Sequence, residues 1–219
     1  MKTQWIAATS LALSLVAGSA AADDDNLWLG LRAGTQGLGL EATWRPVPYL
    51  DLRAGFNTYD YDTDREEAGI NYDVDVDLSS AYLTLNARVP LSPFRFSAGL
   101  VANGNEGGFI GTDTGTYTIG GETFNATDVG TLRGKATFDS VSPYAGVGLD
   151  FRVFDTFGLH FDAGAMYQGE AELSLAADGA LSSQQAFQDA LERERIELQD
   201  EISDYKWYPV VAVAFSVNF

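Results

Sequence analysis

Apolar and polar residues alternate with a period of two in eight segments of the chain. In residues 50–57, for example, Leu50 and Leu52 fall on one face and Asp51 falls on the other. Because successive side chains of a β-strand point to opposite sides, this period predicts strands rather than helices. The eight predicted strands cover residues 27–33, 38–45, 50–57, 81–89, 94–103, 145–152, 159–173 and 211–219.

The connections between these strands differ in length. The short ones are residues 45–48, 90–93 and 155–158. The long ones are residues 60–71, 104–130 and 176–204. An even number of antiparallel strands, with short turns at one end and long loops at the other, is typical of bacterial outer-membrane barrels. The connection at 34–37 is the exception, because it is tight but falls among the long ones.

The alternation changes phase at two places in the predicted strands. These places lie near Ser79–Ser80 and near Asp139–Val141. A bulge inserts one extra residue into a strand, and so changes which side chains share a face. We therefore expect a β-bulge at each of them.

The residue types on each face indicate which face meets the surroundings. The apolar face is nearly free of charge, whereas the polar face combines glycines with arginines and carboxylates. Aromatic residues gather near strand ends, as in interfacial belts: Trp28, Trp44, Tyr49, Tyr59, Tyr144, Phe154, Tyr167, Tyr205 and Trp207. A soluble lipocalin-like barrel, with its apolar face inward, is the alternative. We predict an all-β fold, an eight-stranded antiparallel up-and-down transmembrane β-barrel.

One helix is expected in the last outer loop, over residues 182–202. Phe187, Leu191, Leu198 and Ile202 recur there at helical spacing, and the other positions are mostly charged or polar. Ser182 and Gln185 have the spacing of a capping box. In the third outer loop, Gly120–Gly121 within Tyr117–Phe124 predicts a small hairpin.

Residues 1–22 have the features of a secretory signal peptide. Lys2 precedes an apolar stretch, and Ala20–Ala21–Ala22 then provide a small-residue cleavage site before three aspartates. The predicted organisation is a signal peptide at 1–22 and an outer-membrane barrel at 23–219. This places the mature chain in the bacterial outer membrane.

Composition narrows the function classes. The chain has 31 acidic and 13 basic residues and a net charge of −18, which disfavours nucleic acid as a partner. It has no cysteine and one histidine, so a thiolate or zinc site is not expected. His160 falls beside Asp162 on the polar face, but no serine is placed next to it by the sequence. We expect no catalytic site and no cofactor.

The inward face of the predicted barrel carries the first candidate site, a lumen charge network. Its members are Arg32, Glu41, Asp51, Arg53, Arg88, Arg95, Asp150, Arg152, His160, Asp162 and Glu170. An eight-stranded barrel is just wide enough for side chains to fill it, so such charges must be paired. The network is either a packed plug of ion pairs or a narrow charged path, with glycines leaving room for water.

The second candidate site is an acidic outer rim. Its members are Asp60, Asp62, Asp64, Glu66, Glu67, Asp73, Asp75 and Asp77. Such a cluster concentrates cations and offers oxygen ligands to Ca²⁺ or Mg²⁺. The segment 60–64 is similar to the start of a calcium loop, but Arg65 and Asn71 replace the glycine and glutamate that this loop requires. A solvated rim that favours cationic over anionic solutes is the simpler interpretation, and the metal stays unknown.

Several segments resemble one family of outer-membrane proteins, the ornithine-uptake porin CarO and its relatives. The chain ends in Phe219 with apolar residues at alternate positions, which is similar to the C-terminal assembly signal of bacterial barrels. The segments resembling CarO are residues 39–49, 119–124, 133–135, 142–148, 167–173 and 208–210. The resemblance implies an eight-stranded outer-membrane barrel and slow passage of basic amino acids. Apart from residues 119–124, the outer loops at 104–130 and 176–204 show no close match.

Two functions remain open at this point. One is a passive channel for cationic small molecules such as basic amino acids. The other is a closed structural or surface-interaction barrel without transport activity. The expected partners are outer-membrane lipid, lipopolysaccharide and the barrel assembly machinery, with small cationic solutes or divalent cations as candidate ligands.

Overall fold

The computed structural model describes residues 26–67, 70–112, 115–154 and 156–218. For residues 64–67 and 70–72 this description is limited to the backbone. The predicted signal peptide at 1–22 and the terminal Phe219 lie outside the described residues.

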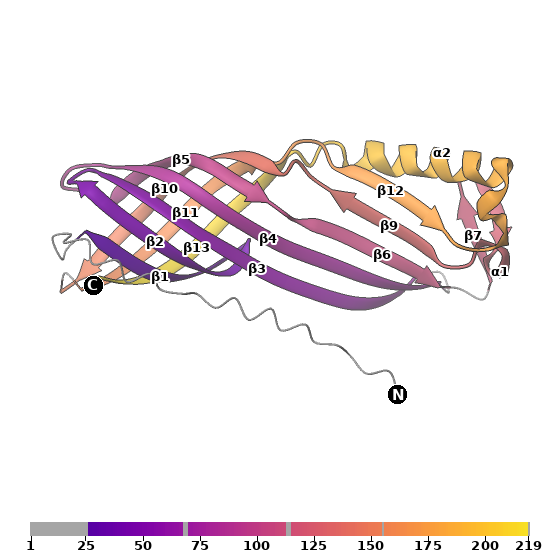
Figure 1. Ribbon diagram of the computed structural model, residues 1–219, viewed down its shortest axis with the longest axis horizontal. Helices are drawn as coiled ribbons and strands as arrows, with labels where there is room; N and C mark the ends of the chain where they lie inside the picture. The colour runs from indigo at the N-terminus through magenta and orange to yellow at the C-terminus, as the bar shows by residue number, and fades with distance from the viewer. Residues whose placement is uncertain (1–25, 68–69, 113–114, 155, 219) are drawn as a thin grey trace, which may run out of the picture.

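Eight antiparallel strands close into a barrel, as predicted (Figure 1). Around the ring they are β1 (Leu27–Gly34), β2 (Gly37–Val47), β3 (Leu50–Glu67), β4 (Ile70–Arg88), β5 (Phe94–Asn103), β10 (Val141–Val153), β11 (Phe157–Tyr167) and β13 (Trp207–Asn218). The barrel closes where Trp28 of β1 pairs with Asn218 of β13 and Gly34 pairs with Ala212. Closure satisfies the backbone groups that an open sheet edge would leave unpaired.

A sheet extends from one end of the barrel (Figure 1). It consists of the outer parts of β3 and β4 together with β6 (Glu106–Thr112), β9 (Leu132–Thr137) and β12 (Glu172–Ala177). The predicted long connections at 60–71, 104–130 and 176–204 contain strands that were not predicted, in addition to the predicted helix and hairpin. The alternation was missed because its polarity reverses outside the barrel. We call this part the extension sheet.

The faces of β4 show this reversal. Leu83 and Leu85 point out of the barrel and are exposed, and Asp75 and Asp77 lie on the same face further along the strand. Val76, between these two aspartates, points to the opposite, inward face of the strand. Since apolar groups face outward only in the barrel, the two parts of the strand are suited to different surroundings.

The bulge predicted near Ser79–Ser80 was wrong. The pairs Asn57↔Ser80 and Thr58↔Ser79 continue the register of β3 and β4 without interruption. The apparent change of phase is the reversal of polarity, not an extra residue. Near Asp139–Val141 the change of phase coincides with a break between two strands at residues 138–140, and not with a bulge inside a strand. The pairs Val141↔Ala102 and Thr137↔Glu106 keep one register across this break.

The predicted helix is present as α2 (Gln185–Ile202). It begins after a short helical turn, η1 (Ala180–Ser183), and its N-cap is Gln184, without a side-chain hydrogen bond. The predicted capping box was therefore wrong, because Ser182 belongs to the preceding turn. The predicted hairpin is formed by β7 (Thr116–Ile119) and β8 (Glu122–Asn125), with positive φ angles at Gly120 and Gly121, and α1 (Ala126–Val129) follows it.

A small hydrophobic core joins α2 to this hairpin and to α1. Phe187, Ala190 and Leu191 of α2 pack with Ile119 and Val129. The ring of Phe187 meets that of Phe124 edge-on at 5.1 Å between centroids. This core lies at the end of the extension far from the barrel (Figure 1).

Large apolar side chains cover the outside of the barrel. Leu31, Leu38 and Phe96 are each more than 60% exposed, whereas Arg53 and Arg95 on the inside are 1–2% exposed. Trp44, Tyr49 and Trp207 are also exposed on the outside, as expected. The expectation was wrong for Trp28 and Tyr144, which point inward and are buried. Among the described residues, no helix has the length and hydrophobicity needed to cross a membrane.

Candidate functional site: the barrel interior

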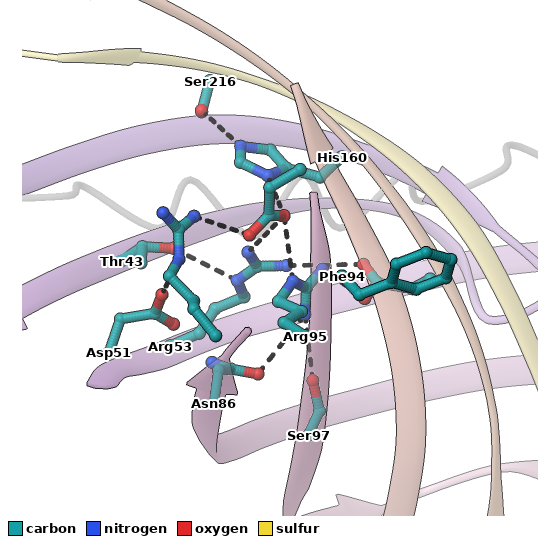
Figure 2. A network of polar contacts seen from close by, with 12 residues as sticks. Thr43, Asp51, Arg53, Asn86, Phe94, Arg95, Ser97, His160 and Ser216 are labelled. Carbon is teal, nitrogen blue, oxygen red and sulfur yellow. Dashed lines mark hydrogen bonds and ion pairs between the residues drawn. The ribbon is translucent and has the colours of Figure 1, made fainter. Parts of the chain in front are cut away.

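Arg95 is almost completely buried inside the barrel, within a network of polar contacts (Figure 2). Strand β5 turns it inward, where its guanidinium lies 2.9 Å from Asp150 Oδ1 and 2.5 Å from Asp162 Oδ1. It also donates to Ser97 Oγ and Asn86 Oδ1. One arginine thus joins carboxylates from two neighbouring strands, β10 and β11.

Gly148 explains how so large a side chain fits. A Cβ at this position would lie 2.7 Å from Arg95 Cζ, so any residue other than glycine would displace the guanidinium. Of the two predicted alternatives, the narrow charged path required these glycines to leave room for water. At this position the room is filled by arginine instead.

Asp162 connects Arg95 to two further arginines. Its Oδ2 lies 2.8 Å from Arg32 Nη1 and 3.4 Å from Arg53 Nη1. Glu41 pairs with the same two arginines at 3.4 and 3.7 Å and accepts a hydrogen bond from Tyr82 at 2.9 Å. Charges at this depth are tolerated because nearly every one has an opposite partner.

A second group of ion pairs lies toward the turn end of the barrel. Arg88 bridges Asp51 at 2.9 Å and Asp150 at 2.5 Å. Arg45, which was not among the predicted residues, lies 3.9 Å from Asp51 and 5.4 Å from the Trp28 ring centre. Arg45 follows Glu41 and Thr43 at every second position of β2, on the inward face. Its position in the sequence could therefore have identified it as a member of the network.

The predicted residue Arg152 lies at the exposed edge of the network, and Glu170 lies away from it. Arg152 is exposed at the turn end, and its guanidinium carbon lies 5.4 Å from the Trp28 ring centre. The lumen assignment of Glu170 was wrong: it is exposed and pairs with Lys206 at 2.5 Å, outside the barrel. β11 ends at Tyr167, and the positive φ of Gly169 breaks the alternation on which the assignment rested.

His160 makes two short contacts that were not predicted (Figure 2). Its Nδ1 lies 2.7 Å from Asp150 Oδ1, and its Nε2 lies 2.7 Å from Ser216 Oγ. The expected neighbour was Asp162. The inward position of Ser216 was readable from the alternation in the last strand, but its proximity to His160 depends on the β11–β13 register, which the sequence does not give.

Ser216, His160 and Asp150 have the atoms of a nucleophile, a base and an orienting acid. Ser216 and His160 are 2% and 3% exposed, however, and neither lines the cavity of the lumen. A Cβ at Gly158 would lie 2.5 Å from Ser216 Oγ, which shows how closely the backbone packs on this hydroxyl. A substrate carbonyl needs room beside the nucleophile, so this geometry is that of a packed polar chain.

The remaining space in the lumen is small. A cavity of about 20 Å³ lies among Arg32, Gln36, Arg53, Tyr82 and Asp162. That is room for roughly one water. Toward the extension, Val101, Tyr144, Met166 and Val210 form a buried apolar layer. The interior is therefore packed from the ion pairs to this layer.

The acidic residues of the predicted rim lie on the outer face of the extension sheet. Asp60 pairs across the strands with Asp77, and Asp62 with Asp75; Asp73 lies further along β4. The hydrogen bond with Asp60 raises the pKa of Asp77, and desolvation followed by the charge of Asp62 raises that of Asp75. The side chains of Asp64, Glu66 and Glu67 lie outside the described residues.

Metal binding by these carboxylates stays a prediction. Within the described part of the chain, no group of three or more acidic, histidine or cysteine side chains is arranged to hold a metal ion. Basic residues on β9 instead partly neutralise the face, and Lys135 lies 2.7 Å from Glu106.

Comparison with known proteins identifies similar folds. No family model matches the chain, and no curated protein sequence matches it significantly. The crystal structure of Acinetobacter baumannii CarO2 matches with a TM-score of 0.60 and 23% identity, over 89% of this chain and 98% of that one. The crystal structure of Acinetobacter baumannii CarO matches with a TM-score of 0.58 and 21% identity, over 89% and 98%. The barrel and its extension are thus a fold already known.

Proposed function

We propose that this chain is an outer-membrane barrel whose lumen is closed by its own side chains and which acts through the extension sheet at the cell surface. The observation that carries the proposal is the packed network around Arg95 and Asp162. Five inward arginines and four carboxylates lie in contact with one another there: Arg32, Arg45, Arg53, Arg88, Arg95, Glu41, Asp51, Asp150 and Asp162.

The outer surface of the barrel supports a location in lipid. A charge on this surface would cost roughly 2–4 kcal/mol at the bilayer midplane, and the exposed side chains are instead leucine, valine and phenylalanine. In this proposal the signal peptide at 1–22 directs export, and the barrel assembly machinery inserts the chain. The turn end then faces the periplasm, and the extension faces outward.

Closure follows from the energetics of the network. Separating one partner from a buried ion pair leaves an uncompensated charge and costs about 3–5 kcal/mol. A path for a hydrated solute would require several such separations around Arg95. The resting barrel is therefore expected to conduct neither ions nor amino acids.

The acidic face favours a second candidate function, a passive channel for cationic small molecules. Asp60, Asp62, Asp75 and Asp77 would raise the local concentration of cations beside the barrel. Basic amino acids are the solutes that the resemblance to CarO implies. This candidate requires the network to open in the membrane.

Planar-bilayer recording distinguishes the two candidates. Folded wild-type protein is measured in salt alone and in gradients of ornithine or arginine, beside the double variant Arg53→Ser/Arg95→Ser. The closed barrel predicts no unitary conductance in the wild type and new conductance in the double variant, since two large side chains leave the lumen.

The matched control is Arg133→Ser/Lys135→Ser, which removes the same charges from the exposed face of β9. It is expected to stay closed. Wild-type steps that carry ornithine or arginine would support the channel and contradict the closed barrel.

A further inference from the structure

A hollow of about 320 Å³ lies between the inward face of the extension sheet and the C-terminal half of α2. The apolar side chains that surround it are Val74, Val76, Phe109, Leu173, Leu198 and Ile202. Small-molecule sites in proteins have volumes of about 300–1,000 Å³ and mostly apolar walls. Unlike the outer face of the barrel, this surface is bounded on two sides, by sheet and by helix.

The helix keeps the hollow open because it is fixed at two other places. Its N-terminal half is held by the core around Phe187. Further along, Gln199 accepts a hydrogen bond from Leu173 N at 2.9 Å and donates one to the carbonyl of Ala171. Leu198 and Ile202 flank this anchor and stay only half-buried.

Glycine in β6 enlarges the hollow. Gly107 pairs with Val76 and Ala136 on the inward face, and a Cβ built there would meet no atom within 4 Å. Its φ is not positive, so the backbone does not require glycine. Filling this position with a side chain would therefore occupy the hollow without straining the strand.

The charges around the hollow indicate the kind of ligand. Among the described side chains, the only ionisable residue in its lining is Asp75, whose side chain lies on the opposite face of the sheet. A neighbouring cavity shares Phe109 and Leu198 with the hollow and is lined by Glu194. The apolar walls therefore border Glu194, whose Oε2 accepts a hydrogen bond from Gly120 N at 2.7 Å and whose negative charge adds to the net charge of −18 of the chain.

We propose that this hollow binds a cationic amphipath, with its hydrocarbon chain among Val76, Leu173 and Ile202 and its positive group toward Glu194. The inference deepens the proposed function, since it gives the extension a ligand class. It does not depend on the state of the lumen.

Methyl NMR in phosphatidylcholine nanodiscs tests the proposal with dodecyltrimethylammonium as the probe. Saturable shifts are expected at Leu173, Leu198 and Ile202, while Leu83 and Val213 on the barrel surface show only the non-saturating effect of probe dissolved in lipid. Dodecyl sulfate has the same hydrocarbon chain and the opposite charge. Its half-saturating concentration is expected to be about tenfold higher than that of dodecyltrimethylammonium.

Two glycine variants separate the hollow from the rest of the sheet. Gly107→Leu fills the hollow and is expected to raise the half-saturating concentration at least about tenfold. Gly108→Leu places the same side chain on the outer face, beside Asp75 and Lys135. This variant is expected to leave the half-saturating concentration of the probe unchanged. If Gly107→Leu does not fold, Leu198→Asp tests the same site from the helix, away from the strand pairing.

Absence of saturable shifts at the three hollow residues would overturn the proposal, as would equal effects of the two glycine variants. Equal binding of dodecyl sulfate would overturn the choice of a cationic ligand. Planar-bilayer recording on the same preparations keeps the two proposals distinguishable, because loss of the ligand site in a protein that does not conduct would leave the closed barrel intact.

Discussion

At the scale of single residues, the interior of the barrel depends on arginines that each serve more than one carboxylate. Arg95 is the clearest case, since its loss would leave both Asp150 and Asp162 with fewer partners. The inward alternation already indicated that these residues would meet. Which arginine meets which carboxylate depends on the strand register.

Replacing Arg95 with alanine is expected to lower the free energy of unfolding by about 3–5 kcal/mol, because it leaves buried carboxylates undercompensated. Lys135→Ala is the control: its pair with Glu106 is about half exposed, so the loss should stay below roughly 1 kcal/mol. Urea titrations in detergent micelles, followed by tryptophan fluorescence, measure both. Equal small losses would contradict a tightly packed network.

Ser216 is expected to be chemically inert despite its contact with His160. Its burial should prevent labelling by a fluorophosphonate, which reacts with activated serines that a substrate can reach. Intact-mass spectrometry of the folded protein is the measurement. A mass increase located at Ser216, and absent from His160→Ala, would show that the chain of three residues is an active nucleophile.

At the scale of elements, α2 and the hairpin β7–β8 form a core of their own. Phe187→Ala should cost about 3–5 kcal/mol of local stability, because the side chain is fully buried among apolar neighbours. Limited trypsin digestion should then cut α2 at Arg193 and Arg195 more rapidly, while the barrel keeps its heat-dependent shift in gel migration.

Glu197→Ala, on an exposed position of the same helix, is the matched control and should digest like the wild type. Loss of the barrel's gel shift in Phe187→Ala would contradict the independence of the two parts.

The extension sheet is expected to be more stable at low pH. The raised pKa values of Asp75 and Asp77 mean that the folded sheet binds protons more tightly than the unfolded chain does. The resulting stabilisation is fully present below the ordinary aspartate pKa of about 3.9 and is lost as the pH rises through the raised values.

Amide exchange of residues 74–77, corrected for intrinsic rates, should therefore show greater protection as the pH falls. Asp75→Asn/Asp77→Asn should remove most of this dependence, since it removes both repelling pairs. Protection that increases with pH in the wild type would contradict the account.

How far the sequence predicts these elements depends on how constant the surroundings of each strand are. The eight barrel strands were predictable because their side chains alternate between the same two environments throughout. Leu52 and Leu83 face the outside of the barrel, and Arg53 and Thr84 face its interior. The extension was missed because in β4 the aspartates take the face that leucines occupy in the barrel. The contact of His160 with Ser216 was also out of reach, since alternation fixes the face of a residue but not its register.

At the scale of the whole molecule, one set of strands spans two environments. In the barrel, charged side chains fill the interior and apolar ones cover the outside; in the extension, carboxylates cover the outside and valines line the inside. The register through Thr58↔Ser79 is continuous, so the reversal is encoded by side-chain type alone. This arrangement keeps the extension rigidly attached to the barrel, where it presents both its acidic face and its apolar hollow.

Paramagnetic NMR in nanodiscs tests this division most directly. A lipid-borne nitroxide and a water-soluble gadolinium chelate are applied to the same protein, and relaxation is measured along the outward face of β4. The account predicts that the nitroxide broadens Leu83 and Leu85 and the chelate broadens Asp75 and Asp77, with the change near Ser79. Broadening of all four residues by the water-soluble agent alone would contradict a lipid-embedded barrel.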